Sequence, residues 1–308
     1  MKILFTGASS FTGFWFVKTL AGVGHDVVCP LTGELDRYSG ERRRRIEALK
    51  PFCLFVASAP FGSEKFLRLV DAEACHLLCH HAADVTNYRS PDFEPLSALR
   101  HNTHNLRAVL AGMKERGGRA VVLTGSVFEN DEGVGGELLY AASPYGLSKG
   151  LTFQFVRHYC HEAGIPLGKF VIPNPFGPFE EPRFTAFLMT SWKVGHPAEV
   201  KTPDYVRDNI HVDLLALAYV NFIEKTAATM EPLRKTNPSG YVESQGEFAQ
   251  RVVREVRTRT GWACELRLAQ QTDFSEPLGR TNSEPAAQRF SDWDEKRAWD
   301  EFTRFYSG

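Results

Sequence analysis

Short apolar segments alternate with longer amphipathic segments along the first half of the chain. Apolar runs of this length are typical of strands covered on both faces, and we expect strands at 2–5, 25–31, 53–57, 76–81, 120–123 and 169–172. Between them the apolar residues recur with a helical period, which predicts helices at 14–20, 64–70, 95–115 and 144–163. This alternation predicts an α/β fold built on a doubly wound parallel sheet, the Rossmann arrangement.

The alternation stops at 173–178, where proline and glycine are dense. We therefore expect residues 1–174 to form the sheet domain. Residues 175–205 and 226–308 are expected to form a smaller C-terminal α/β lobe. The segment 206–225 has the pattern of a strand followed by a helix, and we expect it to return to the sheet domain.

The first expected strand runs into the turn Thr6-Gly7-Ala8-Ser9-Ser10-Phe11-Thr12-Gly13 and then into a helix. At such a turn a dinucleotide pyrophosphate can bind the N-terminus of the helix. Gly7 allows a tight turn and Gly13 allows close packing, whereas Ser10 stands where a third glycine is expected. An ordinary strand-to-helix turn is the alternative. The predicted cofactor contacts are Gly7, Ser9, Ser10, Phe11 and Gly13.

The second expected strand ends without the acid that binds an unphosphorylated adenosine ribose. Leu31, Thr32 and Gly33 stand there, and Arg37 is close enough in sequence to pair with a 2′-phosphate. We therefore favour NADP(H) over NAD(H), with Thr32 and Arg37 as contacts. The run Arg42 to Arg45 is expected along a solvated helix face and is not assigned to the cofactor.

A tyrosine and a lysine lie four residues apart at the start of the helix expected at 144–163. Ser143 is predicted to be the N-cap, with Pro144 as the first helical residue. Because residues four apart share a helix face, Lys149 would favour the phenolate of Tyr145, which predicts a general acid. On spacing alone, two residues of a solvated helix face are the alternative.

Small or hydroxyl-bearing residues end two later strands. Ala82 and Ala83 follow the strand expected at 76–81 and leave room for a cofactor against the backbone. Thr124 ends the next strand and can hydrogen-bond a substrate oxygen, with Ser126 as the second choice. A threonine that merely ends a strand is the alternative.

The composition narrows the class of protein. The chain has 308 residues, of which 43% are hydrophobic and 24% charged, as is ordinary for a soluble globular protein. A net charge of −1 argues against a nucleic-acid partner. Because no apolar run approaches a membrane-spanning length and the N-terminus opens into a strand, we expect a cytoplasmic protein with no membrane partner.

Six cysteines lie mostly within apolar segments, which predicts reduced and buried thiols. The cluster Cys75-His76-Leu77-Leu78-Cys79-His80-His81 could suggest a metal site. In a strand, however, alternate side chains point to opposite faces, so the cluster would be split. We therefore expect no metal.

Several motifs in one order and spacing carry a resemblance to a known family. They are the glycine turn, Ala82-Ala83, Asn102, Thr124, Tyr145/Lys149, Pro173-Asn174-Pro175-Phe176-Gly177-Pro178 and Val206-Arg207-Asp208-Asn209-Ile210-His211-Val212. Together they resemble the extended short-chain dehydrogenase/reductase family, and most closely its nucleotide-sugar epimerase/dehydratase branch. The resemblance covers Met1 to about Val220 and weakens beyond.

The resemblance implies a catalytic set of Thr124, Tyr145 and Lys149, with Asn102 as a supporting residue. It implies that Asn174 and Arg207 hold a substrate diphosphate. For Arg207, a structural salt bridge with Asp204 or Asp208 is the alternative. Arg280 is a further candidate contact to the nucleotide, and Ser126 to the substrate. The remaining expected cofactor contacts are Ala82, Ala83, Tyr145, Lys149, Ile172 and Asn174.

Departures from the family pattern argue against three of the reactions that this branch catalyses. Gly125 and Ser126 stand where the 4,6-dehydratases of this branch have an Asp-Glu pair, which argues against dehydration. No cysteine and histidine match the pair of the 3,5-epimerase/reductases. The missing acid after the second strand argues against a 4-epimerase, which in this family keeps a tightly bound NAD.

We therefore expect a nucleotide-sugar reductase in which NADPH delivers hydride to C4 of a keto-sugar and Tyr145 protonates the oxygen. A 4-epimerase with retained NAD is the first alternative, and a non-catalytic NADP-binding sensor is the second. A homodimer is expected through the helices at 95–115 and 144–163, because Phe153, Phe155 and Tyr159 add apolar surface. Packing of these helices on their own sheet is the alternative.

Overall fold

A computed structural model of the chain describes residues 1–88, 90–136 and 138–308, which divide into two compact units. The first unit comprises Met1–Glu132, Tyr140–Ile172 and Ala216–Thr236. The second unit comprises Gly133–Leu139, Pro173–Leu215 and Asn237–Gly308. This division differs from the expected domains, since 206–215 belong to the second unit and 226–236 to the first.

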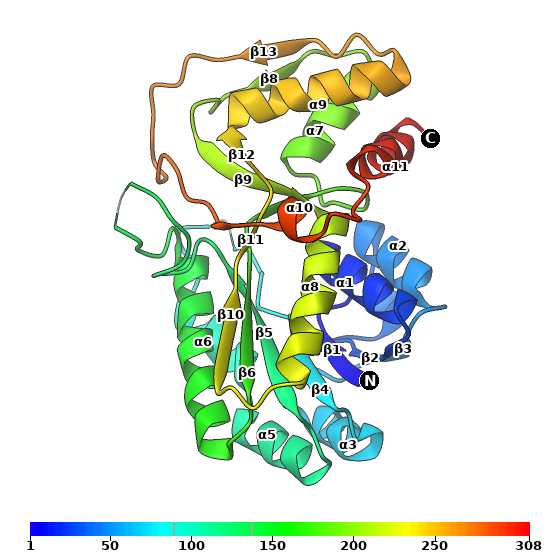
Figure 1. Cartoon of the computed structure of the whole chain (residues 1–308), viewed down its shortest axis with the longest axis vertical. Helices are drawn as coiled ribbons and strands as arrows, with labels where there is room; N and C mark the ends of the chain where they lie inside the picture. The colour runs from blue at the N-terminus through cyan, green and yellow to red at the C-terminus, as the bar shows by residue number, and fades with distance from the viewer. Residues whose placement is uncertain (89, 137) are drawn as a thin grey trace. The chain divides into compact units, whose positions relative to one another are not determined.

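The first unit is built on a seven-stranded sheet in the order β3-β2-β1-β4-β5-β6-β10 (Figure 1). Every neighbouring pair is parallel, which confirms the doubly wound arrangement. The sequence does not predict β10, which joins the sheet because Leu233–Thr236 pairs in register with Leu167–Phe170. The strands are β1 Lys2–Thr6, β2 Asp26–Pro30, β3 Leu54–Val56, β4 Leu77–His80, β5 Ala120–Ser126, β6 Leu167–Ile172 and β10 Leu233–Thr236.

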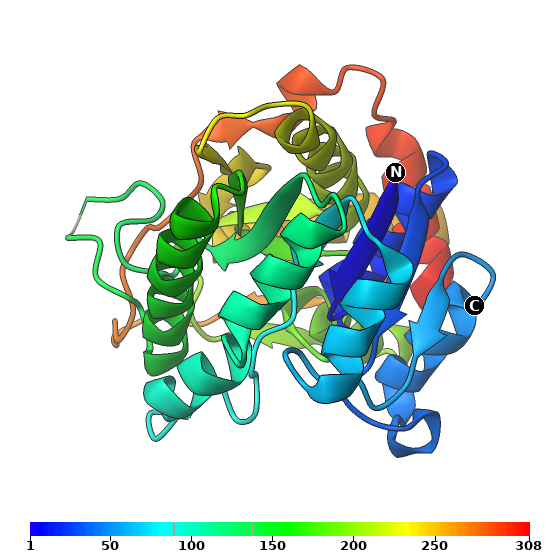
Figure 2. The ribbon, with the colours of Figure 1, turned by 90° about the horizontal axis from the view of Figure 1, so that it is seen from below.

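Helices cover both faces of this sheet. On one face α3, α5 and α6 lie side by side (Figure 2), and Leu4, Val121 and Val156 share one buried core there. On the other face Phe16 of α1 stacks on Tyr219 of α8 with ring centroids 4.0 Å apart. No helix in the described residues is long and apolar enough to cross a membrane. The helices are α1 Phe11–Gly22, α2 Gly40–Leu49, α3 Glu64–Glu73, α4 Pro95–Asn102, α5 Leu106–Glu115, α6 Pro144–Ala163 and α8 Val212–Ala227, with a short 3₁₀ helix η1 at Leu35–Arg37.

The prediction of one helix at 95–115 is wrong, because the chain turns between α4 and α5. Asn105 adopts a left-handed conformation with φ +50°, which a continuous helix does not allow. Its Nδ2 donates a hydrogen bond to the Gly62 carbonyl at 2.8 Å, and this contact holds the turn. By contrast, α6 runs as predicted from its N-cap Ser143 to its C-cap Gly164.

The aromatic residues of α6 do not all face outward. Phe153 lies in the buried core of the first unit, and Tyr159 packs against that core. Phe155 is 42% exposed, and Leu147, two helical turns earlier on the same stripe, is also exposed. Packing on the unit's own sheet therefore accounts for Phe153 but not for Phe155 and Leu147.

The second unit combines small sheets with helices around its own core. Phe176, Trp192, Phe248 and Trp299 are buried together there. One sheet has the order β12-β9-β7, while β8 pairs with β13 and β11 with β14. The elements are β7 Asn174–Phe176, α7 Phe184–Lys193, β8 Ala198–Val200, β9 Val206–His211, β11 Pro238–Ser239, β12 Tyr241–Ser244, α9 Gln245–Thr260, β13 Leu266–Leu268, β14 Glu284–Pro285, α10 Ala286–Arg289 and α11 Glu295–Ser307.

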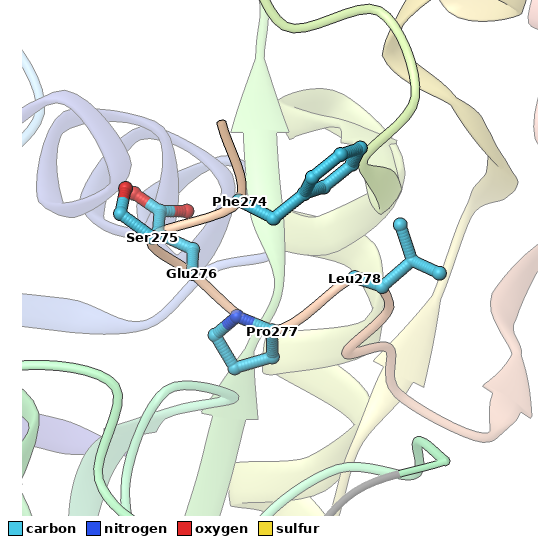
Figure 3. Close-up of a pocket in the computed structure, with 5 residues that line it drawn as sticks. All are labelled: Phe274, Ser275, Glu276, Pro277 and Leu278. Carbon is cyan, nitrogen blue, oxygen red and sulfur yellow. The ribbon is translucent and has the colours of Figure 1, made fainter. Parts of the chain in front are cut away.

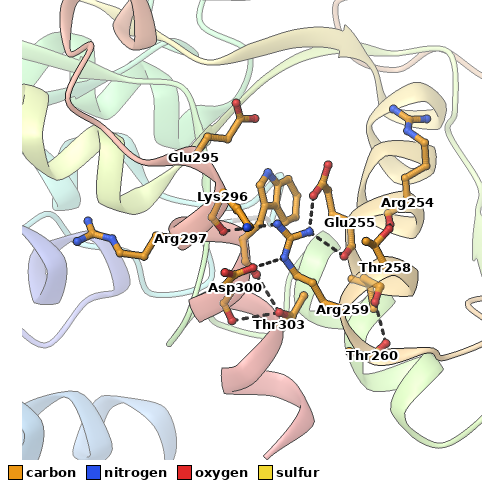
Figure 4. Close-up of polar contacts among 12 residues, drawn as sticks. Arg254, Glu255, Thr258, Arg259, Thr260, Glu295, Lys296, Arg297, Asp300 and Thr303 are labelled. Atoms are coloured by element: carbon orange, nitrogen blue, oxygen red, sulfur yellow. Dashed lines mark hydrogen bonds and ion pairs between the residues drawn. The ribbon is translucent and has the colours of Figure 1, made fainter.

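Charged contacts join two helices of this unit. The Arg259 guanidinium of α9 bonds the Glu255 carboxylate of its own helix at 2.5 Å and the Asp300 carboxylate of α11 at 2.6 Å (Figure 4). Because both acids accept from one planar guanidinium, the contact fixes the angle at which α11 meets α9.

Candidate active site

The turn between β1 and α1 lies directly on the chain that leaves β4. Gly7 has φ +83°, and a Cβ atom there would be 2.9 Å from the Ala82 nitrogen. A Cβ atom at Gly13 would be 2.2 Å from the Gly7 carbonyl oxygen. Both positions therefore require glycine. Ser10 is the N-cap of α1, and its Oγ accepts a hydrogen bond from the Gly13 N–H at 3.1 Å.

This turn fits the pyrophosphate of a dinucleotide. The first backbone N–H groups of a helix lack intrahelical partners and carry a partial positive charge, so the start of α1 suits an anion. The two glycines bring the turn close to β4, and Ala82 and Ala83 add little bulk there. The Ser10 hydroxyl, placed where a third glycine was expected, points to Gly13 and to the ring of His81.

At the end of β2 the expected acid is absent, and Leu31 is buried. The Thr32 hydroxyl shares a hydrogen bond with the Tyr38 hydroxyl at 3.1 Å. The Arg37 side chain lies against Gly33, since a Cβ atom at Gly33 would be 3.4 Å from Arg37 Cδ. A carboxylate that the sequence analysis did not consider, that of Glu34, accepts a hydrogen bond from the Ser58 hydroxyl at 2.6 Å.

The prediction that Arg42 to Arg45 follow a solvated face is wrong for Arg45. Its side chain is 0% exposed, and Nη1 donates a hydrogen bond to the Ser9 carbonyl at 3.2 Å. A guanidinium therefore lies beneath the glycine turn, where it supports the turn and adds positive charge. The hydropathy of the arginine run hides this, because only one of its four residues is buried.

The first turn of α6 holds the predicted acid–base pair. The ring of Tyr145 contacts those of Tyr88 and Phe93, with centroids 5.4 and 5.8 Å away. Lys149 is buried, and its Nζ donates a short hydrogen bond to the Thr124 carbonyl. The alternative of a solvated helix face is therefore wrong for Lys149. Burial lowers the pKa of Lys149, while the Glu129 charge opposes that shift and the Lys169 charge adds to it.

Thr124 and Asn102 both make hydrogen bonds to helix α6. Thr124 is buried, and its carbonyl meets Lys149 while its Oγ1 lies 2.9 Å from His81 Nδ1. Asn102 Nδ2 donates to the Thr152 hydroxyl of α6 at 3.2 Å, and its Oδ1 accepts from the Asp84 N–H at 2.9 Å. The four predicted catalytic residues thus lie on α4, β5 and α6, and buried hydrogen bonds join α4 and β5 to α6.

A buried ion network beside β5 escaped the sequence analysis. Lys169 Nζ bonds the carboxylates of Glu129 at 2.6 Å and Glu132 at 2.8 Å, and the Ser126 N–H donates to Glu129 at 2.7 Å. A Cβ atom at Gly125 would be 2.8 Å from Lys169 Cε, so this glycine makes room for the network. A single lysine in the apolar strand β6 is the signal that could have revealed it.

The neighbouring ends of β5 and β6 carry the last two predicted contacts of the first unit. Ser126 pairs in register with Ile172. The Ser126 Oγ accepts a hydrogen bond from the Phe128 N–H at 3.3 Å, so this hydroxyl stabilises the turn after β5. The Thr124 hydroxyl instead contacts His81, and it is the Thr124 carbonyl that contacts Lys149.

In the second unit Arg207 makes a salt bridge with neither Asp204 nor Asp208. Its Nη2 bonds the Glu276 carboxylate at 2.6 Å, and its Nη1 donates to the Pro277 carbonyl at 3.2 Å. The Arg207 side chain is 7% exposed, whereas that of Glu276 is 55% exposed. The exposed Glu276 carboxylate thus binds the buried Arg207 guanidinium, which could bind a diphosphate in the same way.

Two cavities of the second unit border this contact. Phe274, Ser275, Glu276, Pro277 and Leu278 line one of about 470 Å³ (Figure 3). Arg207 and Glu276 help to line the other, of about 320 Å³, whose remaining walls come largely from 201–205 and 270–275.

Two further predicted ligand residues of this unit are poorly exposed. Arg280 is buried. Asn174 lies in β7, and its Nδ2 is buried with no hydrogen-bond partner among the described residues. A buried donor without a partner costs free energy, so a ligand that accepts from it would bind favourably.

Comparisons with known proteins agree with this architecture. The sequence profile of the NAD dependent epimerase/dehydratase family matches residues 3–233. A search of curated protein sequences finds no match. A solved UDP-glucose-4-epimerase from Stenotrophomonas maltophila, with bound NAD and formylated UDP-arabinopyranose, is 21% identical, with a TM-score of 0.75 over 100% of this chain and 97% of that one.

Two further solved structures are similar. The UDP-glucose 4-epimerase of Thermotoga maritima, with UDP-glucose, is 17% identical with a TM-score of 0.73, over 99% of this chain and 98% of that one. The UDP-glucuronic acid 4-epimerase of Bacillus cereus, in complex with UDP-glucuronic acid and NAD, is 17% identical with a TM-score of 0.73, over 99% of each chain. These likenesses establish the fold.

Proposed function

Because the chain belongs to the NAD-dependent epimerase/dehydratase family and is an enzyme of that class, we propose that it acts on a nucleotide-linked sugar as a 4-epimerase that uses NAD(P). The contact between the Lys149 ammonium and the Thr124 carbonyl carries this proposal. It holds the start of α6, and with it Tyr145, at the carboxyl end of β5 in the unit that contains the glycine turn.

Each side chain then has a role in proton transfer. A bound nicotinamide would accept a hydride from the sugar carbon and return it. Tyr145 would take the hydroxyl proton as the ketone forms and give it back as the alcohol reforms. Lys149 would favour the tyrosinate through its charge and bind the nicotinamide ribose, and the Thr124 hydroxyl would hold the sugar oxygen. Asn102 would keep α4 fixed against α6.

The epimerase replaces the reductase expected from the sequence as our main proposal. Solved epimerases of sugar nucleotides share the fold over nearly the whole chain, and their structures contain NAD. The reductase remains the second candidate because of the loop after β2. There Arg37 lies against Gly33, and Leu31 supplies no acid for the ribose, which favours NADPH.

We also propose that the first unit binds the cofactor and the second holds the nucleotide. Arg207 would bind the diphosphate in place of Glu276, and the free Nδ2 of Asn174 would donate to a phosphate or ribose oxygen. Ser126 would contact the sugar. Arg280, buried in the second unit, would contact the nucleotide.

The direct test of function is conversion without added cofactor. The purified protein should retain NAD, measured by chromatography after denaturation, and should interconvert UDP-glucose and UDP-galactose or the corresponding uronic acids. Tyr145→Phe is the matched control and should retain NAD without converting sugar. Turnover of a 4-keto sugar only with added NADPH would favour the reductase, and cofactor binding without any turnover would favour the sensor.

A homodimer is proposed through α4 and α6. Leu147 and Phe155 expose one apolar stripe of α6, and Leu96 of α4 is also exposed. Phe155→Glu should shift the molar mass measured by light scattering from two chains to one. Phe187→Glu, at an exposed position in the second unit, is the control and should leave the mass unchanged.

A further inference from the structure

Two consecutive histidines at the end of β4, His80 and His81, connect different parts of the first unit. His80 Nδ1 lies 3.1 Å from Thr6 Oγ1, and its Nε2 lies 2.8 Å from the Asn102 carbonyl oxygen. The Thr6 oxygen already accepts from the N–H groups of His81 and Ala82, so its own proton goes to His80 Nδ1. His80 therefore carries its proton on Nε2 and donates it to Asn102.

His81 makes the more informative set of contacts. Its Nδ1 lies 2.9 Å from Thr124 Oγ1, and its Nε2 lies 3.1 Å from both Ser10 Oγ and Thr12 Oγ1. One imidazole thus spans the space between the glycine turn and the alcohol at the end of β5. These contacts cross from α1 through β4 to β5, and all of the residues belong to the first unit.

The ring of His81 is neutral at physiological pH. Burial, together with the charges of Lys149 and His80, lowers its pKa to about 3. A neutral imidazole has one donor and one acceptor nitrogen, so the hydrogen bonds at its two edges depend on each other.

The contacts of Ser10 favour one direction for these hydrogen bonds. Its Oγ accepts from the Gly13 N–H and keeps a proton that it can donate to His81 Nε2. His81 Nδ1 then carries the ring proton and donates to Thr124 Oγ1. The Thr124 hydroxyl accepts at this edge and keeps a proton of its own to donate.

We propose that His81 is a positioning residue that couples the phosphate-binding turn to the hydroxyl of Thr124. This inference rests on the proposed function for the role of Thr124, but the contact with the turn does not. A buried polar group that loses its partner is destabilised, so Ser10 and Thr124 constrain each other through the ring. An anion that binds the turn and reorients the Ser10 hydroxyl changes what Nε2 can accept, and therefore what Nδ1 offers to Thr124.

Two amide substitutions test the two ring nitrogens of His81 one at a time. The amide of His81→Asn reaches the place of Nδ1, and the longer amide of His81→Gln reaches the place of Nε2. His81→Asn should keep kcat within about twofold and raise the Kd for NADH or NADPH, read by nucleotide fluorescence, about tenfold. His81→Gln should do the opposite, and His81→Leu should lose both.

The control is His76→Asn, at the other end of β4, where the ring accepts only a hydrogen bond from the Lys2 N–H. It should leave both kcat and Kd unchanged. Equal effects of His81→Asn and His81→Gln on kcat and on Kd would overturn the proposal, because they would indicate a structural role alone. If no sugar nucleotide is turned over, the proposed function fails. The Kd comparison still decides the contact with the turn.

A second measurement needs no variant. In nitrogen-15 spectra of histidine-labelled wild-type protein, the His81 signals should show a neutral ring protonated on Nδ1, and added NADH or NADPH should shift both ring nitrogens. A His81 ring that is unmoved by a nucleotide that binds would overturn the coupling, even if the amide variants fail to fold.

Discussion

The two compact units hold their candidate ligand-binding side chains in different ways. In the first unit Thr124, Lys149 and Asn102 are buried and make hydrogen bonds to one another's elements. In the second unit Arg207 is buried, but its carboxylate partner Glu276 is largely exposed on a segment without regular structure. The first arrangement is held by buried hydrogen bonds, whereas the second is a contact that we propose a ligand anion replaces.

The difference suggests that the first unit serves the chemistry and the second serves the binding of the diphosphate. Chemistry depends on groups held in place, because proton transfer requires a fixed distance. Capture of a diphosphate gains from an arginine that is kept in position by a weaker, exchangeable acid. Burial favours the neutral form of titratable groups in both units. It lowers the pKa of His80 to about 4 and that of His81 to about 3 in the first, and it raises the pKa of Glu180 to about 8 in the second.

The largest effect is expected at the rigid site. Tyr145→Phe removes the proposed proton donor and should lower kcat by about 10²–10⁴-fold while leaving NADH binding nearly intact. Steady-state kinetics and nucleotide fluorescence would measure the two quantities. Turnover that is unchanged in the Phe variant would show that the first unit's arrangement serves no acid–base chemistry.

The buried ion network should contribute most to stability. Glu129 is 0% exposed, and Glu129→Gln leaves Lys169 with one carboxylate fewer, so the free energy of unfolding should fall by about 3–5 kcal/mol. Urea denaturation followed by tryptophan fluorescence would measure it. Glu47→Gln, in the exposed pair with Arg43, is the control and should leave the midpoint nearly unchanged. Equal effects of the two changes would contradict the importance of burial.

Substitutions on the two sides of the contact between Arg207 and Glu276 should change UDP affinity in opposite directions. Arg207→Ala should weaken UDP binding about tenfold to hundredfold, because it removes a charge-assisted partner of the diphosphate. Glu276→Gln should tighten UDP binding about threefold, since the amide competes less well for the guanidinium. Titration calorimetry would measure both. If Glu276→Gln weakens binding as Arg207→Ala does, Glu276 positions the arginine instead of competing for it.

The smallest expected effect is a pH dependence in the second unit. The folded-state pKa of Glu180, about 8, lies above its ordinary 4.5, so the stability supplied by the protonated form is lost as the pH rises through 8. Glu180→Gln should therefore gain about 1 kcal/mol relative to wild type between pH 7 and pH 9. Urea titrations at both values would show it, with exposed Glu199→Gln as the control.

Most of the first unit's fold follows from local sequence signals. Six strands are apolar enough on both faces to be recognised, and α6 has both a Ser143 N-cap and a Gly164 C-cap. The break at Asn105 could not be predicted in this way. Its left-handed conformation is held by the carbonyl of Gly62, which is 43 residues away in the sequence.

In the candidate site, too, some features can be predicted from local sequence and others cannot. The glycine turn, Thr124 and the Tyr145/Lys149 pair are visible because each motif occupies one short stretch at a strand end or helix start. The partners of these residues are not visible. His81 reaches Thr124 across 43 residues, and Arg207 reaches Glu276 across 69.

The sequence by itself therefore determined six of the seven strands of the parallel sheet, most of the helices that cover it and the residue types that gather at its carboxyl edge, because these depend on periodicity, caps and turns within a few residues. Only the tertiary structure decided which side chains meet. The burial of Arg45, the network around Lys169 and the bridge through His81 depend on strand order and register, which bring distant residues into one low-dielectric interior where unpaired polar groups are too costly to persist.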